Sequence, residues 1–214
     1  MNALLEGIGP LLQAIGVTVM LALLAGVGAI VLGVLVTIAR VSPIPILRWA
    51  AFAYVQFFVN VPLLVLLILA VFALPDAGIL LPLTPTAVIV LAVYEAAYVA
   101  EAIRSGVNSI PPGQVEAARA LGLTLGHTLT RVIVPQAMRS VVQPLGNVMI
   151  ALAMNTALAA AVGVVELTSQ ANRINLVAAQ PIAIFTIAGL IYMAIALVIG
   201  LGAGAIEKKV AFSR

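Results

Sequence analysis

Ionisable side chains in an apolar stretch of the sequence are the first candidates for chemistry. Glu95 and Glu101 lie inside such a stretch, and Arg104 follows directly after it. A charge in a bilayer costs about 2.5–3.5 kcal/mol on insertion scales and usually faces a cavity or a partner. Glu101 and Arg104 have the spacing at which helical side chains neutralise each other, so we expect a structural ion pair. Glu95 has no such local partner. It is either a cavity carboxylate that meets an amino group, one half of a salt bridge to another span, or a residue at a subunit interface.

Uncharged hydrogen-bonding residues in the apolar stretches are candidates for the lining of the same path. They are Asn60, Tyr98, Asn155 and Thr156. Side chains of this kind also join helices to one another within a membrane. The sequence leaves both roles open for each of them.

The composition excludes several kinds of catalytic and metal chemistry. There is no cysteine and a single histidine, His127, which rules out thiol catalysis, disulfides and a multi-histidine metal site. The phosphate loop of ATPases requires Gly-x-x-x-x-Gly-Lys-Ser/Thr, but the only lysines are Lys208 and Lys209, after the last apolar stretch. We therefore expect no enzyme, no metal and no cofactor in this chain. Any ATP or magnesium that the protein uses would have to bind to a separate subunit.

Membrane-spanning helices are the elements expected to position these residues. Of the 214 residues, 64% are hydrophobic and 8% are charged, whereas about 25% are charged in a soluble domain. A spanning helix needs about 20 mostly apolar residues. We expect one all-α integral membrane domain, residues 1–214 with a core of about 15–207, containing five transmembrane helices. Their predicted ranges are 15–39, 47–74, 86–103, 136–165 and 181–206.

Basic residues are concentrated in alternate connections between the predicted spans. Nine of the ten lie in or next to the first connection, in or next to the third connection, or after the fifth span, and only Arg173 lies elsewhere. Cytoplasmic loops of membrane proteins carry an excess of lysine and arginine. We therefore predict that the amino terminus is outside and the carboxyl terminus inside. The net charge of +3 is small, and nucleic acid is not an expected partner.

A polar segment from Gly113 to Pro135 interrupts the apolar sequence on the predicted cytoplasmic side. The run from Gln114 to Leu121 contains good helix formers, and Gly122 is a natural helix stop. A second amphipathic stretch, 125–133, leads back to the fourth span. The segment predicts a short helix across the cytoplasmic mouth that is too polar to enter lipid and therefore contacts a partner in water.

The spacing in this segment resembles the cytoplasmic loop of ATP-binding-cassette (ABC) importer permeases. Glu-Ala-Ala at 116–118 is followed after three residues by Gly122, and after nine more by Val-Ile-Val-Pro at 132–135. Further motifs resemble the polar amino acid permeases, and glutamate permeases among them, so that the resemblance covers about residues 17–207. These motifs are Arg40–Pro43, Pro62–Leu64, Tyr98, Glu101, Arg104–Gly106, Gly113, Gln114, Pro135–Ala137, Pro144–Asn147, Ile150–Leu152 and Asn155–Thr156.

The resemblance implies a type I ABC importer permease fold, with a cytoplasmic coupling helix that docks on an ABC ATPase subunit. In that family Glu116 would contact the ATPase, the two alanines would allow close packing and Gly122 would permit a sharp exit. The implied ATPase-coupling residues are Gln114, Glu116, Ala117, Ala118, Arg119, Gly122 and Pro135.

The same resemblance implies further partners and a location in the cytoplasmic membrane of a prokaryote. One partner is a second permease subunit, in a homodimer or a heterodimer. Another is an extracytoplasmic substrate-binding protein, which would contact the segments around Asp76 and from Glu166 to Asn175.

The expected function is to move a polar amino acid, glutamate-type by resemblance, by alternating access coupled to the ATPase. Two departures concern the charge of the substrate: the subfamily often has arginine where this chain has Val59, and lysine where it has Met154. One alternative is a stand-alone ion-coupled secondary amino acid carrier with Glu95 as its proton site. An intramembrane enzyme is disfavoured, because the chain has no cysteine and no paired intramembrane aspartates.

Overall fold

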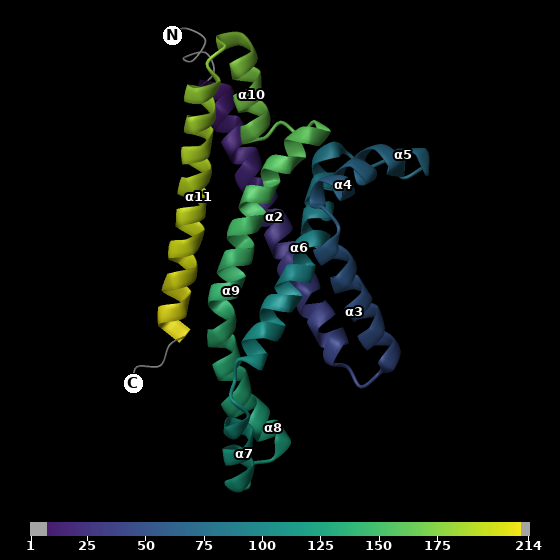
Figure 1. Cartoon of the computed structure of the whole chain (residues 1–214), viewed down its shortest axis with the longest axis vertical. Coiled ribbons are helices and arrows are strands. Elements are labelled where there is room, and N and C mark those ends of the chain that lie inside the picture. The colour runs from purple at the N-terminus through teal and green to yellow at the C-terminus, as the bar shows by residue number, and fades with distance from the viewer. Residues whose placement is uncertain (1–7, 211–214) are drawn as a thin grey trace.

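The computed structural model describes residues 8–210, which form helices joined by short connections and contain no strand (Figure 1). This confirms the predicted all-α class. The helices are α2 (Ile8–Val41), α3 (Pro45–Asn60), α4 (Leu63–Ile68), the π-helical turn η1 (Leu69–Ala73), α5 (Leu74–Asp76), α6 (Leu83–Asn108), α7 (Pro112–Ala120), α8 (Leu125–Thr128), the π-helical turn η2 (Leu129–Ile133), α9 (Val134–Asn155), the 3₁₀ segment η3 (Thr156–Val162), α10 (Leu167–Ala178) and α11 (Pro181–Val210).

Four helical runs are long and apolar enough to cross a membrane. They are Gly9–Val41, Leu83–Asn108, Leu125–Val162 and Pro181–Val210. They correspond to the first, third, fourth and fifth predicted spans. The third run continues without interruption from α8 through η2 and α9 to η3.

The second predicted span, 47–74, is not the single helix that we expected. It is divided into Pro45–Asn60 and Leu63–Asp76, which meet at an angle of 102°. Val61 is extended at the break, with φ −104° and ψ 132°. The following Pro62 accounts for this, because proline disfavours the helical conformation of the residue before it and has no N–H to donate. The described residues therefore contain four spans, or five if the bent pair is one span.

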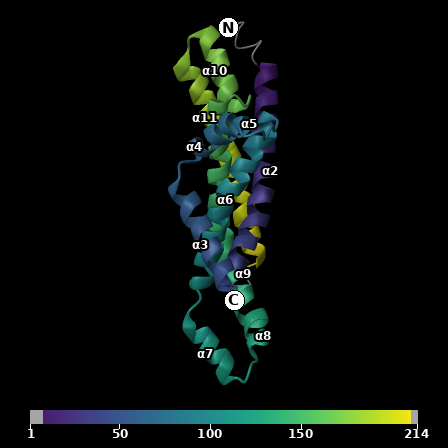
Figure 2. The same cartoon turned by 90° about the vertical axis from the view of Figure 1, so that its right-hand side faces the viewer.

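Helix α6 lies in the middle of the bundle, against α2 and α9, with α3 also in contact (Figure 2). Leucines from four elements meet in the largest core cluster: Leu21 of α2, Leu67 of α4, Leu91 of α6 and Leu152 of α9. Helix α11 packs on α9 at the edge of the bundle. The best buried span, α6, is thus held on both sides, which makes it a rigid place for polar groups.

Glycines on α2 allow it to approach α6 closely. A Cβ atom on Gly33 would lie 2.5 Å from Val99 Cγ1 and 2.9 Å from the Ala96 carbonyl oxygen, and one on Gly28 would lie 2.9 Å from Ala92 Cβ. Small residues at helix crossings are the usual means by which membrane helices pack. The pair α2–α6 is therefore expected to be intolerant of any side chain at these positions.

Replacing Gly33 by alanine should destabilise the protein by about 1–3 kcal/mol, the usual cost of forcing a methyl group into a packed contact. The measurement is the melting temperature of the purified protein in detergent. Gly16→Ala is the matched control, because Gly16 lies on the same helix and a Cβ atom there would meet no other atom within 4 Å. Equal melting temperatures for the two variants would contradict the close packing described here.

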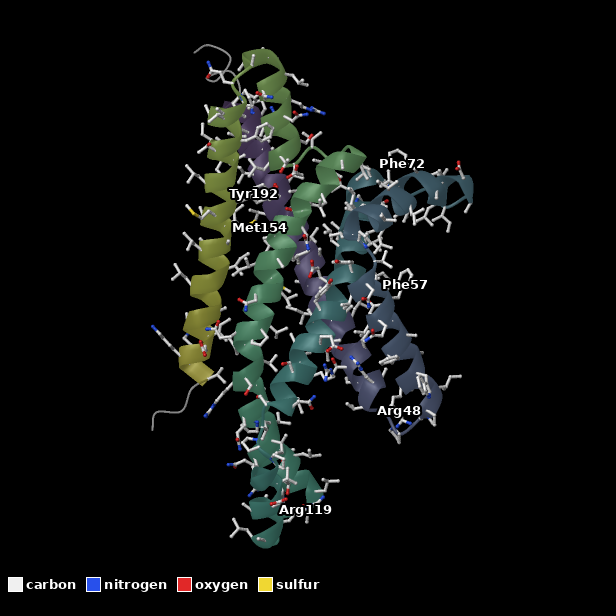
Figure 3. All side chains as sticks on the ribbon, viewed as in Figure 1. Arg48, Phe57, Phe72, Arg119, Met154 and Tyr192 are labelled. Carbon is white, nitrogen blue, oxygen red and sulfur yellow. The ribbon has the colours of Figure 1, made fainter. Side chains whose placement is uncertain are left out.

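The connections between the spans gather at two ends of the bundle. The α2–α3 turn, α7, α8 and the carboxyl-terminal end of α11 are at one end, and the α4–α5 segment and α10 are at the other, with the start of α2 (Figure 1). Arg48 and Arg119 lie at the first end (Figure 3). Helices α7 and α8 extend past the other helices at this end. The segments that are rich in basic residues therefore share one end.

A short helix, α10, follows the fourth span. Its first turn is fixed by Glu166, which is fully buried and accepts hydrogen bonds from Ser169 N (2.7 Å) and Tyr192 Oη (2.6 Å). Leu167 N also donates to Thr18 Oγ1 of α2 (3.0 Å). Glu166 begins the segment that was expected to contact a binding protein, but its side chain is buried and bonds to Tyr192 of α11, so it is not itself part of an exposed surface.

Candidate functional site

A cavity of about 380 Å³ opens between α6 and α9 and has polar side chains in its lining. Its lining residues are Tyr94, Glu95 and Tyr98 of α6 and Asn147, Val148, Ala151 and Asn155 of α9. The α9 residues at 147, 151 and 155 are four positions apart and form one stripe along the helix. A larger cavity of about 480 Å³ between α2 and α11 is lined by aliphatic side chains alone and offers no polar group to a ligand.

Glu95 provides the charged group of this cavity. Its side chain is 1% exposed, and Asn155 Nδ2 donates to its Oε1 at 2.7 Å. In the part of the chain that the structure describes, Glu95 makes no salt bridge and no hydrogen bond through Oε2. A salt bridge to another span of the same subunit was one of the expected alternatives, and the described residues do not form it. The remaining oxygen is available to a group that enters the cavity.

Two tyrosines form the wall beside Glu95. The hydroxyl groups of Tyr94 and Tyr98 are 3.0 Å apart, and their ring centroids are 5.2 Å apart at 45°. Aromatic faces attract cations, and hydroxyl groups both donate and accept hydrogen bonds. The cavity therefore combines a carboxylate, two aromatic hydroxyls and two amides with an apolar surface.

The structure brings together three of the five residues that the sequence suggested for the path. Glu95, Tyr98 and Asn155 line the cavity, but Asn60 and Thr156 do not. Asn60 is exposed at the end of α3 and donates to the Gln56 carbonyl (2.7 Å), and Thr156 is fully buried and donates to the Ala153 carbonyl (2.7 Å). Both side chains bond within their own helices and lie outside the lining of this cavity, and their place on the path stays a prediction.

Tyr94 and Asn147 also line the cavity, although the sequence did not lead us to select them. Asn147 precedes Asn155 by two helical turns, so helical spacing along the fourth span would have indicated it. Tyr94 gave a weaker signal, since it lies next to Glu95 and one helical turn before Tyr98.

The expected pair of Glu101 and Arg104 is part of a larger charge network. Arg104 Nη2 lies 2.6 Å from Glu101 Oε2, and Arg40 of α2 pairs with the other carboxylate oxygen. Arg40 also lies over the ring of Phe52 of α3, at 5.7 Å. The network joins α2, α3 and α6, and Arg40 was not foreseen as a member. Glu101 is thus neutralised within the subunit and lies outside the cavity lining.

The polar segment after α6 folds into two short helices, α7 and α8. Pro112 occupies the first turn of α7, and Gly122 takes a left-handed conformation with φ +75° directly after it. Thr124 caps α8 by accepting from His127 N at 3.4 Å. The chain then passes through η2 into α9, with Pro135 in the first turn. The predicted helix 114–121 is observed with its ends shifted by one or two residues.

Helix α7 has an exposed face and a face that packs on its own subunit. Gln114, Glu116, Ala117 and Arg119 are exposed, and Gln136 Nε2 donates to Gln114 Oε1 at 3.3 Å. The resemblance implied that Ala118 packs against the ATPase. Ala118 is only 3% exposed, so its side chain packs on its own subunit instead. Leu121, which sequence reasoning did not single out, is 81% exposed beside Gly122.

No group of three His, Cys, Asp or Glu side chains within residues 8–210 is arranged to hold a metal ion. The polar residues of the cavity and the exposed face of α7 are the two candidate sites of the described chain.

The comparisons with known proteins agree on one kind of relative. The sequence profile of the family described as binding-protein-dependent transport system inner membrane component matches residues 10–212. A probable glutamine ABC transporter permease protein of Bacillus subtilis is 33% identical over 192 residues, covering 90% of this chain and 89% of that protein. A glutamate transport system permease protein of Corynebacterium glutamicum is 34% identical over 232 residues, covering 100% of both. A crystal structure of an amino acid ABC transporter with histidines has a TM-score of 0.90 at 29% identity, covering 97% of each chain.

Proposed function

Because the chain belongs to the family of binding-protein-dependent transport system inner membrane components and is a permease subunit of an amino acid ABC importer, we propose that the α6–α9 cavity receives the amino acid. In the same proposal, α7 couples this cavity to ATP hydrolysis on a separate subunit. The chain acts as a single transmembrane domain. The observation that carries the proposal is a connection: the two helices that line the cavity, α6 and α9, are joined by the loop that contains α7 and α8.

The chemistry of the cavity supports a role in amino acid binding. Every amino acid at neutral pH carries an α-ammonium group, and Glu95 Oε2 is placed to accept from it. Asn155 holds the other carboxylate oxygen at 2.7 Å and so fixes the orientation of the group. The amide of Asn147 and the tyrosine hydroxyls provide donors for the α-carboxylate. Asn60 and Thr156 act outside this cavity.

The exposed face of α7 supports docking on an ATPase. Glu116, Ala117 and Arg119 present charged and small groups beside the apolar Leu121. A buried apolar anchor within a polar rim is the usual arrangement of a protein–protein interface. ATPase closure would push the loop, and the loop would displace α6 and α9 relative to each other. This displacement is the alternating-access step, and the chain needs no nucleotide or magnesium site of its own.

The alternating connections support an amino terminus outside and a carboxyl terminus inside. The end that contains α7, α8 and the α2–α3 turn would face the cytoplasm, because it holds most of the basic residues. A second permease subunit would complete the path, and a substrate-binding protein would deliver the amino acid to the end with α10. The exposed Asn172 and Arg173 of α10 fit that contact better than the buried Glu166.

The finer assignment of a glutamate-type substrate has less support than that of an amino acid. It came from sequence motifs such as Arg40–Pro43, which forms the end of α2 and the turn to α3 and is outside the cavity lining. Relatives are named as glutamine and as glutamate permeases. We therefore assign a polar amino acid on the basis of family.

Reconstitution in proteoliposomes with the ATPase and binding-protein partners tests the proposal. Uptake of the labelled amino acid should require ATP and fall to background with an ATPase variant that binds but does not hydrolyse ATP. A sodium or proton gradient without ATP should drive no uptake. Gradient-driven uptake by this chain in the absence of the ATPase would instead establish the stand-alone carrier.

A further inference from the structure

Among the described residues that line the α6–α9 cavity, one side chain is charged, and its charge is negative. Glu95 is the only ionisable acid among the described lining residues, and no lysine, arginine or histidine lines the cavity with it. The other polar groups of the lining are neutral: two tyrosine hydroxyls and two asparagine amides. An entering ligand therefore meets one carboxylate and no cation.

Cations on the lining helices are too far away to change this. Arg104 follows Glu95 by nine positions on α6, and Arg139 precedes Asn147 by eight on α9, which places each about 12–14 Å further along its helix. Arg104 also shares the carboxylate of Glu101 with Arg40. The cations of this network are thus committed to an acid outside the cavity.

From this one-sided lining we propose that the cavity binds amino acids with a neutral or cationic side chain and discriminates against acidic amino acids. The inference rests on the proposed function of the cavity as the amino acid site and names its substrate class. Together with Glu95, a basic amino acid would give a net charge of zero, a neutral amino acid −1 and glutamate −2. Like charges that face each other without a counter-ion oppose binding. The faces of Tyr94 and Tyr98 add an attraction for ammonium or guanidinium groups.

The test is direct binding to the complex of the permease with its ATPase in nanodiscs, without the binding protein, whose own selectivity would mask that of the cavity. The ligands are L-arginine, L-glutamine and L-glutamate, measured by microscale thermophoresis. L-Glutamate should bind at least about tenfold more weakly than either of the others. Equal affinity for L-glutamate and L-glutamine would overturn the inference while leaving the cavity as an amino acid site. If none of the three binds, the proposed site itself is wrong, and the inference falls with it.

Two variants locate the discrimination. Glu95→Gln should bring the ratio of glutamine to glutamate affinity towards one. Asn147→Lys adds a cation to an exposed position of the lining and should raise glutamate affinity at least about threefold. Val177→Lys is the control, because Val177 is 78% exposed on α10, outside the lining. A complex that is monodisperse and melts as the wild type shows that a variant is folded. An unchanged ratio in folded Glu95→Gln, or in folded Asn147→Lys, would overturn the role of the lining charge.

Discussion

Replacing Leu121 by aspartate is expected to abolish ATP-driven uptake and to remove most of the ATPase that co-purifies with the permease. Leu121 is 81% exposed at the end of α7, next to the exposed Glu116 and Ala117 face. On the proposed docking role of α7, Leu121 is the apolar anchor for the ATPase, and truncating such an anchor typically costs more than about 2 kcal/mol, or roughly thirtyfold in affinity. Aspartate would add the cost of burying a charge at the interface. Co-purification and uptake in proteoliposomes are the measurements.

The control for this variant is the same substitution at the opposite end of the bundle. Leu176 is 76% exposed on α10, so Leu176→Asp adds the same charge to a similarly exposed leucine and should leave the ATPase bound. Normal co-purification of an active ATPase with Leu121→Asp would refute the docking role of α7. Gly122 sets the geometry of this face: with φ +75°, it should accept asparagine better than valine, although a Cβ there would meet no atom within 4 Å.

Removing the carboxylate of Glu166 is expected to have the largest effect on stability. The side chain is fully buried, and its two oxygens accept from Ser169 N and Tyr192 Oη. Glu166→Ala would remove the cap of α10, leave Ser169 N without its acceptor and open a cavity. It would also remove the carboxylate that accepts from Tyr192 Oη, whose remaining partner is Thr168 Oγ1 at 3.0 Å. Buried donors left unsatisfied cost about 1–3 kcal/mol each, and a lost cap about 1 kcal/mol, so a loss of roughly 3 kcal/mol is expected.

The melting temperature of the purified protein measures this loss. Tyr192→Phe, which removes one of the two hydrogen bonds, should have a smaller effect in the same direction. Glu116→Ala removes an exposed acid from α7 and should leave the melting temperature within about a degree of wild type, since exposed substitutions change stability little. Glu166→Ala and Glu116→Ala melting at the same temperature would show that the buried network contributes no stability.

Features fixed by neighbouring residues could be predicted from the sequence. The ends of α7 follow from Pro112 and Gly122, whose backbone preferences act over one or two residues. The apolar runs revealed four spans, because a bilayer requires long apolar helices whatever their neighbours. The spacing of the polar segment indicated the family, which the matching profile confirmed.

Features that depend on packing between distant segments could not be predicted in this way. Asn155 binds Glu95 across 60 positions, and Arg40 binds Glu101 across 61. No periodicity in the sequence relates such pairs. Pro62 indicated a break in the second span. The angle of 102° between its two halves also depends on where α4 packs, which is against η3 and α6. Glu166 looked like a surface acid because the donors that it binds, among them Tyr192 of α11, come from elsewhere in the fold.

The cavity wall and the docking loop occupy one uninterrupted stretch of the chain, from Leu83 at the start of α6 to Val162 at the end of η3. A single genetic exchange of this stretch between related permeases would move the lining charge and the ATPase-facing surface together. If the cavity and α7 have the roles proposed above, substrate choice and the choice of ATPase are inherited as one unit. On the roles proposed above, a permease that acquires this stretch by recombination would take both the substrate preference and the ATPase preference of the donor, whereas point substitutions in the lining would alter the substrate alone.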